Sequence, residues 1–252
     1  MRMLETAGIT KRFGGLIAVA DAGLVVPEGG IVALIGPNGA GKTTLFAVIA
    51  GFLAPDAGTV RFRGKDITGL APEAICRRGL VRTFQIVQPF GALSVRENIA
   101  VGAHARVRNR REALTCAEKV AGELGMTPLL DRPAATLTVA ARKRLELARA
   151  LATEPKLLLL DEVMAGLNPA EVEGIIAIVR RIRDTGVTVL LIEHVMQAVM
   201  SLAENIYVLN QGRIIAEGDP EAVARLPEVV EAYLGHGAAA GIGNRLAAGS
   251  AR

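Results

Sequence analysis

Short, uninterrupted runs of apolar residues that end in polar residues recur along the chain. Three of them are GGIVALIG (Gly29–Gly36), KLLLLDE (Lys156–Glu162) and TVLLIEH (Thr188–His194). Runs of this kind are typical of strands buried on both faces of a largely parallel sheet. A helical pattern follows the first run, from Lys42 to about Gly51. The alternation predicts an α/β protein whose ligand binds beyond the carboxyl ends of the strands.

The segment from about Gln88 to Leu151 has a different pattern. Residues that favour helices dominate it, and from Arg142 onward the sequence predicts an amphipathic helix. We interpret this segment as a helical subdomain inserted into the α/β core. It contains a basic cluster made of Arg106, Arg108, Arg110 and Arg111. The cluster is either a solvated helix face or a contact for a partner or lipid head groups. The Gly- and Ala-rich sequence after Leu234 predicts a disordered tail.

Composition narrows the classes of protein that fit this pattern. The chain has 252 residues, which suits one large domain or a core with a smaller insertion. Its 51% hydrophobic content is high for a freely soluble protein. No run approaches the roughly 18 consecutive apolar residues that span a bilayer, so we expect a subunit whose apolar surface is covered by partners.

Charge and cysteine content are consistent with a cytosolic protein that binds an anionic ligand. A net charge of +4 suits an anionic ligand, but 3% aromatic residues without Trp argue against a platform that stacks nucleic-acid bases. Cys76 and Cys116 have no CxxC spacing, which predicts two reduced thiols in the cytosol. The first 15 residues contain no apolar signal segment.

The sequence GPNGAGKT, Gly36–Thr43, matches the phosphate-binding pattern G-x-x-x-x-G-K-[ST] between a predicted strand and a predicted helix. Glycines let successive backbone N–H groups point at one anion, and the helix N-terminus adds partial positive charge. Lys42 is expected to reach the β- and γ-phosphates of a nucleotide, and Thr43 to ligate Mg²⁺. The alternative is a glycine turn that binds nothing. The predicted nucleotide contacts are Gly36, Pro37, Asn38, Gly39, Ala40, Gly41, Lys42, Thr43 and Thr44.

Polar residues end the next two apolar strands. Asp161 is expected to hold Mg²⁺ directly or through water, and Glu162 to polarise the attacking water beside the γ-phosphate. His194 is expected to hydrogen-bond the γ-phosphate. Taken alone, the carboxylate pair could be a strand end that meets solvent, and His194 a structural residue. The phosphate-binding loop favours the catalytic interpretation of all three.

In this order the motifs resemble the ATP-binding subunits of ABC transporters, over about residues 3–235. The resemblance implies an α/β, RecA-like P-loop NTPase core with an N-terminal antiparallel β portion and an inserted α-helical subdomain. It implies that Phe13 in KRFGG stacks on adenine and that Gln85 in RTFQ senses Mg²⁺ and the attacking water, a catalytic and metal-binding role. Gly166–Pro169 would cross to a second ATP-binding subunit. The expected division is 1–87 for the first part of the core, 88–151 for the helical subdomain, 152–235 for the second part of the core and 236–252 for the tail.

The narrower resemblance is to the branched-chain amino acid uptake type, through RTFQIVQPFGALSVRENIAVGAH and YVLNQGRIIAEGDPEAVARLPEVVEAYL. It implies an ATPase, peripheral on the cytoplasmic face of the inner membrane, that uses ATP and Mg²⁺. Its partners would be integral-membrane permease subunits and a second ATP-binding subunit, with no nucleic acid. Two such subunits close head to tail around two ATP molecules, each held between the P-loop of one subunit and the signature segment of the other.

Three alternatives remain beside this interpretation. One is the ATPase subunit of a related lipopolysaccharide-export or urea-uptake system. Another is an ATPase of the same family that acts on nucleic acid or ribosomes, although such chains usually carry tandem cores or a long coiled-coil insertion. The third is a weakly hydrolysing regulatory ATP-binding module.

The segment aligned with the signature departs from the family pattern. The family usually reads LSGGQ, or near LAYGQ in the amino-acid uptake branch, whereas Leu137–Ala141 read LTVAA. Thr138 keeps a hydroxyl and is expected to contact the partner's ATP. Ala140 and Ala141 replace the expected Gly and Gln, and a Cβ at 140 would obstruct the approach of backbone N–H groups to phosphate and disfavour any positive φ. We therefore expect an intact site on this chain's own P-loop, a weak site completed for the partner, and a heterodimer.

Overall fold

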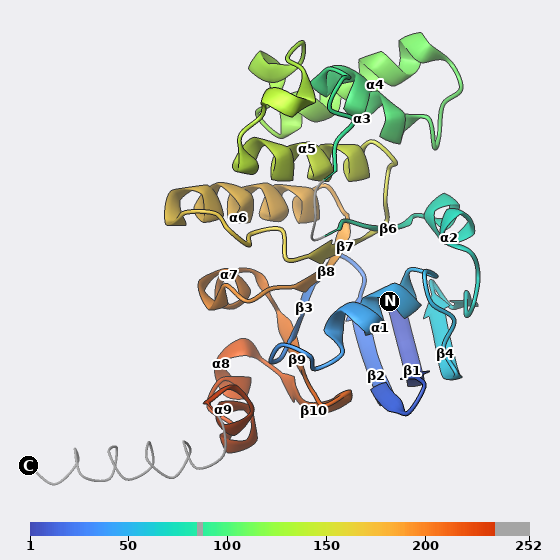
Figure 1. Ribbon diagram of the computed structural model, residues 1–252, viewed down its shortest axis with the longest axis vertical. Helices are drawn as coiled ribbons and strands as arrows, with labels where there is room; N and C mark the ends of the chain where they lie inside the picture. Colours follow the sequence, from blue (N-terminus) through green and yellow to red (C-terminus); the bar gives the residue numbers. More distant parts are fainter. Residues whose placement is uncertain (85–87, 235–252) are drawn as a thin grey trace, which may run out of the picture.

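The computed structural model describes residues 1–84 and 88–234, and Figure 1 shows two sheets within them. The first is a six-stranded sheet of order β10-β9-β3-β8-β7-β6, in which all pairs are parallel except β9 with β10. Its strands are β3 (Ile31–Ile35), β6 (Leu80–Arg82), β7 (Leu157–Asp161), β8 (Thr188–Ile192), β9 (Asn205–Asn210) and β10 (Arg213–Gly218). The three apolar runs of the sequence are thus adjacent central strands.

The second sheet is antiparallel, of order β2-β1-β4-β5. Its strands are β1 (Arg2–Phe13), β2 (Leu16–Pro27), β4 (Ala57–Phe62) and β5 (Lys65–Asp66). This sheet is the N-terminal antiparallel β portion expected from the sequence. Helix α1 (Lys42–Ile49) lies between the two sheets and carries the phosphate-binding loop at its start.

Alternation along the core strands divides the interior into two clusters. In β3, Ile31, Ala33 and Ile35 pack on one face of the sheet, and Val32 and Leu34 on the other. The first face is covered by α5 (Val139–Leu151), α6 (Pro169–Asp184) and α7 (Met196–Leu202), and the second by α1 and the antiparallel sheet. Strands β3, β7 and β8 have five residues each, and all of these are buried, as expected for strands between two layers.

The region between β6 and β7 is helical within the described residues. Helices α3 (Val95–Ala103), α4 (Arg110–Glu123) and α5 lie together at the top of Figure 1, and two short 3₁₀ turns lie between α4 and α5. The N-cap of α3 is Ser94, which forms a reciprocal capping box with Glu97. The expected α/β fold with an inserted helical portion is confirmed.

One boundary differs from the prediction made for it. Helix α5 begins at Val139 rather than at Arg142, because the Thr138 hydroxyl accepts a hydrogen bond from the Ala141 N–H at 3.3 Å and caps the helix. Residues 139–141 are therefore the first helical turn, and in this conformation no positive φ is needed at Ala140.

The basic cluster is not one uniform surface. Arg106 donates to the backbone carbonyls of Thr153 at 2.7 Å and Arg77 at 3.0 Å, and so ties the end of α3 to neighbouring segments. Arg108, Arg110 and Arg111 are exposed. The predicted tail, residues 236–252, lies outside the described residues, as does Gln85.

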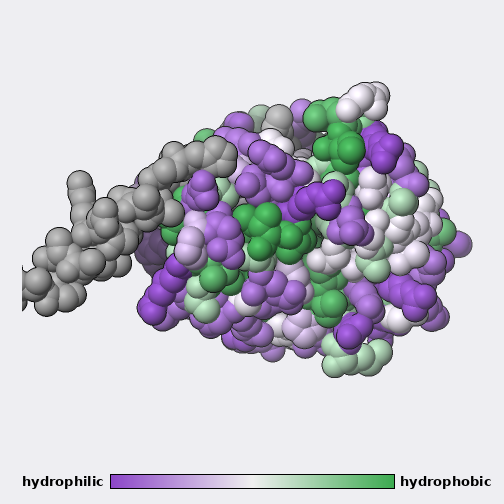
Figure 2. All heavy atoms as spheres, turned by 90° about the horizontal axis from the view of Figure 1, so that it is seen from below, coloured by the Kyte–Doolittle hydropathy of each residue, from purple (hydrophilic) through white to green (hydrophobic). Residues whose placement is uncertain are grey.

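Three short helices complete the described chain: α2 (Pro72–Arg78), α8 (Pro220–Val223) and α9 (Pro227–Leu234), each beginning at a proline. No helix among the described residues has the length and apolar character needed to cross a membrane. Figure 2 shows the molecule from below, where apolar patches alternate with polar groups.

Candidate functional site

The loop between β3 and α1 can be built only with glycine at two positions. Gly36 has a φ of +150°, and a Cβ added there would lie 2.0 Å from the Leu209 carbonyl oxygen. Gly41 has a φ of +104°, and its Cβ would lie 2.2 Å from the Ala18 carbonyl oxygen. Because β2 and β9 press so closely on the loop, side chains at either position would displace it.

The Lys42 ammonium lies inside this loop. Its Nζ donates to the carbonyl oxygens of Gly36 at 2.7 Å and Pro37 at 2.9 Å, and the side chain is buried. Burial lowers the pKa of Lys42, while the nearby carboxylates of Glu162 and Asp161 act in the opposite direction. The loop therefore places a cation beside the N-terminus of α1, and both favour a bound anion.

A hollow of about 510 Å³ opens beside the loop. The structure brings Phe13, Asn38–Thr44 and Glu162 together in its lining. Phe13 stands at the end of β1 with 47% of its surface exposed, so a flat ring can lie against it. Thr138 is not among the lining residues: it lies at the start of α5 and is exposed.

Asp161, at the end of β7, is almost fully buried and pairs with Arg82. Arg82 Nη2 lies 2.7 Å from Asp161 Oδ2, and the Asp161 N–H donates to the Thr83 hydroxyl at 3.2 Å. Asp161 Oδ1 is buried and has no hydrogen-bond partner. An unsatisfied carboxylate oxygen costs free energy unless it meets a cation or water, so this atom fits a magnesium ion held with Thr43.

Glu162 and His194 form a direct pair between β7 and β8. The two side chains meet at 2.7 Å between His194 Nε2 and Glu162 Oε1, and Glu162 is 14% exposed. The Glu162 backbone has a φ of +50°, a left-handed conformation that few residues with a side chain adopt. The geometry aims a carboxylate into the hollow and places an imidazole against it. Such an arrangement can orient and polarise a water molecule.

A second carboxylate, Glu193, is buried behind this pair. Its Oε1 accepts a hydrogen bond from the Met164 N–H at 2.9 Å, and burial raises the pKa of Glu193 to about 7. Below that pH a protonated carboxyl needs no counter-charge. Above it the protein must keep a buried anion near Glu162.

Replacing Glu193 by Gln should therefore change how stability depends on pH. Between the ordinary pKa of 4.5 and about 7 the folded state binds more protons than the unfolded state, so wild-type stability falls as pH rises through this range. Gln keeps the acceptor for Met164 without the charge. We expect the variant to be more stable at pH 8 by on the order of 3 kcal/mol, and by under about 1 kcal/mol at pH 5.

Urea unfolding of both proteins from pH 5 to 8 measures this difference. Glu123→Gln on the exposed surface of α4 is the matched control, and its stability should follow the wild type. Wild-type and Glu193→Gln curves that stay parallel across the range would contradict the prediction.

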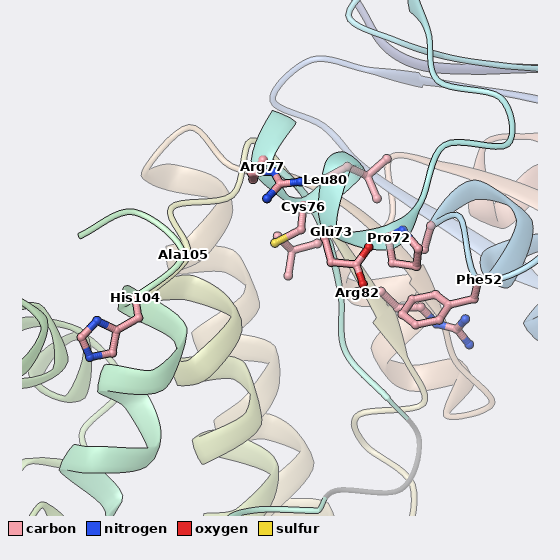
Figure 3. Close-up of a pocket in the computed structure, with 11 residues that line it drawn as sticks. Phe52, Pro72, Glu73, Cys76, Arg77, Leu80, Arg82, His104 and Ala105 are labelled. Carbon is pink, nitrogen blue, oxygen red and sulfur yellow. The ribbon is translucent and has the colours of Figure 1, made fainter. Parts of the chain in front are cut away.

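A second hollow, of about 490 Å³, lies apart from the phosphate-binding loop. Figure 3 shows its lining, with Pro72, Glu73, Cys76 and Arg77 of α2 on one side and His104 and Ala105 across from them. Phe52 lies at its edge, 5.4 Å from the Phe84 ring centroid, and both rings are nearly half exposed. The Arg82 guanidinium lies 5.9 Å and 5.5 Å from these two ring centroids.

Several contacts of the site were not predicted from the sequence. The pair of Arg82 with Asp161 joins positions 79 residues apart. Gln211 and Gly212, in the β9–β10 turn, line the nucleotide hollow, and the Gly212 N–H donates to the Ala40 carbonyl at 2.9 Å. Their positive φ values of 47° and 79° reflect a tight turn, of which the glycine in the Gln-Gly dipeptide is a local signal.

The fold and the phosphate-binding loop together define an ATP-binding cassette, an ATPase of the P-loop class. The family model for ABC transporters matches residues 19–165, and the model for branched-chain amino acid ATP-binding cassette transporters matches residues 213–239. The chain belongs to the ABC transporter ATP-binding subunits, of the branched-chain amino acid type.

Relatives with curated names support this assignment over almost the full chain. The high-affinity branched-chain amino acid transport ATP-binding protein BraF of Pseudomonas aeruginosa is 43% identical, over 92% of this chain and 98% of that protein. LivG of Escherichia coli, with the same description, is 40% identical over 92% and 98%. A probable LivG of Archaeoglobus fulgidus is 37% identical over 93% and 96%.

Solved structures agree on the fold. A nucleotide-free ATP-binding cassette from an ABC transporter matches with a TM-score of 0.86 and 35% identity, over 94% of this chain and 100% of that chain. The ADP conformation of another ABC transporter cassette matches with a TM-score of 0.85 and 36% identity, over 94% and 100%.

Proposed function

We propose that this chain drives uptake of branched-chain amino acids by ATP-dependent closure onto a second, different ATP-binding subunit. The observation that carries the proposal is an asymmetry between the two functional surfaces. The chain's own site combines Lys42, Asp161 and the Glu162–His194 pair, whereas the first turn of α5 presents Ala140 and Ala141. A complete partner would supply a better signature segment to this chain's P-loop.

In the proposed reaction each residue of the own site has one task. Lys42 and the loop N–H groups bind the β- and γ-phosphates, and Phe13 stacks on the base. Glu162 accepts a proton from the attacking water while His194 holds the carboxylate and the γ-phosphate in place. Mg²⁺, held by Thr43 and Asp161, would neutralise phosphate charge. Gln85 lies outside the described residues, and its catalytic and metal-binding role stays a prediction from the sequence.

In this proposal a segment of a membrane permease subunit binds in the second hollow, the one lined by α2, Phe52 and His104. Phe52 lines this hollow and Phe84 packs against the Phe52 ring, and both rings are nearly half exposed. Phe84 directly precedes Gln85 in the sequence. A permease segment seated in this hollow would therefore lie beside Phe52 and beside the Arg82 side chain that pairs with Asp161. The proposal places the chain on the cytoplasmic face of the membrane, and it keeps the division of the chain at residues 1–87, 88–151, 152–235 and 236–252.

The branched-chain substrate is favoured over lipopolysaccharide export or urea uptake. The C-terminal family model is described as that of a branched-chain amino acid ATP-binding cassette transporter, and the named relatives are branched-chain amino acid transport ATP-binding proteins by description. Glu162 opposes the interpretation as a regulatory module, because a module that only binds ATP does not need a carboxylate in the nucleotide hollow.

Removal of magnesium tests the proposed site on this chain's own P-loop. ATP turnover by the purified chain should be slow and should vanish when EDTA removes Mg²⁺. Asp161→Asn should raise the Mg²⁺ concentration for half-maximal turnover by about tenfold or more, because a carboxylate binds a hard cation far better than an amide. Phosphate release against Mg²⁺ concentration measures both effects, with Asp184→Asn on the surface of α6 as the control.

Sedimentation velocity of the same samples tests the partner requirement. With a weak signature segment the wild-type chain should stay mainly monomeric in MgATP. A stable dimer of this chain alone, or turnover that does not respond to Mg²⁺, would overturn the proposal.

A further inference from the structure

Helix α5 carries three polar side chains that reach into the rest of the molecule. Lys143, Glu146 and Arg149 are spaced three residues apart and therefore lie along one face of the helix. Lys143 and Glu146 are only 6% and 9% exposed. We refer to these three residues as the α5 stripe. Helix α5 begins at the segment aligned with the ABC signature. A movement of that segment would therefore move the α5 stripe and the groups that it contacts.

The first member of the stripe contacts the backbone of Glu162. Lys143 Nζ donates to the Glu162 carbonyl oxygen at 3.2 Å. The Glu162 N–H donates to the Ile192 carbonyl at 2.9 Å, and the Ala165 N–H donates to the Glu162 carbonyl at 3.2 Å. Since the φ of Glu162 is +50°, this peptide holds an unfavourable conformation that persists only where its surroundings fix it. Lys143, a side chain from the helical region, is part of these surroundings.

The other two members hold the chain on both sides of residues 85–87. Glu146 Oε1 accepts a hydrogen bond from the Phe84 N–H at 2.5 Å. Arg149 Nη1 donates to the Gln88 carbonyl oxygen at 3.3 Å, and its guanidinium lies 5.1 Å from the Phe90 ring centroid. The same face of α5 thus contacts the residue that carries the catalytic carboxylate and the segments beside Gln85.

We propose that Lys143 is a positioning residue for Glu162 and that it ties this carboxylate to the placement of the chain's own signature helix. The proposal rests on the catalytic role given above to Glu162. A shift of α5, caused by nucleotide on the partner subunit at the helix N-terminus, moves the donor of the Glu162 carbonyl. Lys143 then links the two ATP sites. Glu146 and Arg149 move the Phe84 and Gln88 segments together with the helix.

The test compares Lys143→Met with Lys143→Arg in the full chain. Met fills the buried space without a donor, so the Glu162 carbonyl loses the side-chain donor that holds it and kcat should fall by about tenfold or more. KM and the dissociation constant for ATP should change by less than about twofold, because the phosphate-binding loop is untouched. Arg also donates to a carbonyl and should recover kcat to within about threefold of the wild type. Lys119→Met, on the exposed face of α4, is the control.

Each outcome decides between clear alternatives. A purely structural role would lower thermal stability and ATP binding together and would not be recovered by Arg. If Lys143→Met does not fold, Lys143→Gln replaces it, because its shorter side chain does not reach the Glu162 carbonyl. Wild-type kcat in the variant that folds would overturn the proposal. Glu162→Gln in parallel separates the two claims: if it turns over ATP like the wild type, the proposed role of Glu162 fails first.

Discussion

Glu162→Gln should lower ATP turnover by about 10³-fold while ATP binding changes little, because Gln fills the same space but cannot accept a proton from water. The Gln amide oxygen can still meet His194 Nε2, which lies 2.7 Å from Glu162 Oε1 in the wild type. Phosphate-binding groups of the loop, Lys42 above all, are unchanged. Loss of turnover would therefore report the missing base and not a lost binding site.

The measurement is phosphate release under saturating MgATP, combined with a binding titration of the same preparations. Glu123→Gln, the exposed change on α4, controls for general effects of losing a carboxylate and should turn over ATP like the wild type. The informative alternative is a wild type and a Glu162→Gln variant that hydrolyse equally little. That result would favour the regulatory module over the ATPase subunit.

Local sequence predicted those parts of the fold and site that depend on neighbouring residues. Continuous apolar runs such as Leu157–Leu160 can be satisfied only between two layers, and they became central strands buried on both faces. The phosphate-binding loop was equally predictable, because its glycines, lysine and helix start act within eight residues. The inserted helices were predicted from the helix-favouring residues between about Gln88 and Leu151, whereas the antiparallel β portion followed from the family resemblance alone.

The contacts that hold the carboxylates in place could not be predicted in this way. Arg82 meets Asp161, and Lys143 meets the Glu162 carbonyl, only after β6, β7 and α5 have packed together. The raised pKa of Glu193 depends likewise on burial between β8 and its covering helices. The start of α5 did have a local signal in Thr138, a preferred N-cap residue, but the basic residues after Ala141 drew the predicted boundary three positions too far.

Restoring glycine and glutamine in the signature segment, by the double change Ala140→Gly and Ala141→Gln, should raise turnover of the isolated chain by about tenfold or more, since a gain of only about 1.4 kcal/mol in the closed complex has that effect. Thr138 caps the Ala141 N–H, so the earlier N–H groups of the first turn remain available to an anion. Val139 is 58% exposed, and Ala140 adds a methyl group beside it. We expect both side chains to keep phosphate at a distance from those N–H groups.

Glycine in a first helical turn costs less than about 1 kcal/mol, so the double variant should fold normally. Ala74→Gly, in the first turn of α2, is the matched control for that cost and should leave turnover unchanged. Sedimentation in MgATP supplies an independent readout, because the restored segment should also favour a dimer of this chain. The combination with Glu162→Gln separates closure from chemistry: it should dimerise with ATP and hydrolyse almost none. Equal turnover by the wild type and the double variant would show that Ala140 and Ala141 do not weaken the site, and the argument for an obligatory different partner would lose its basis.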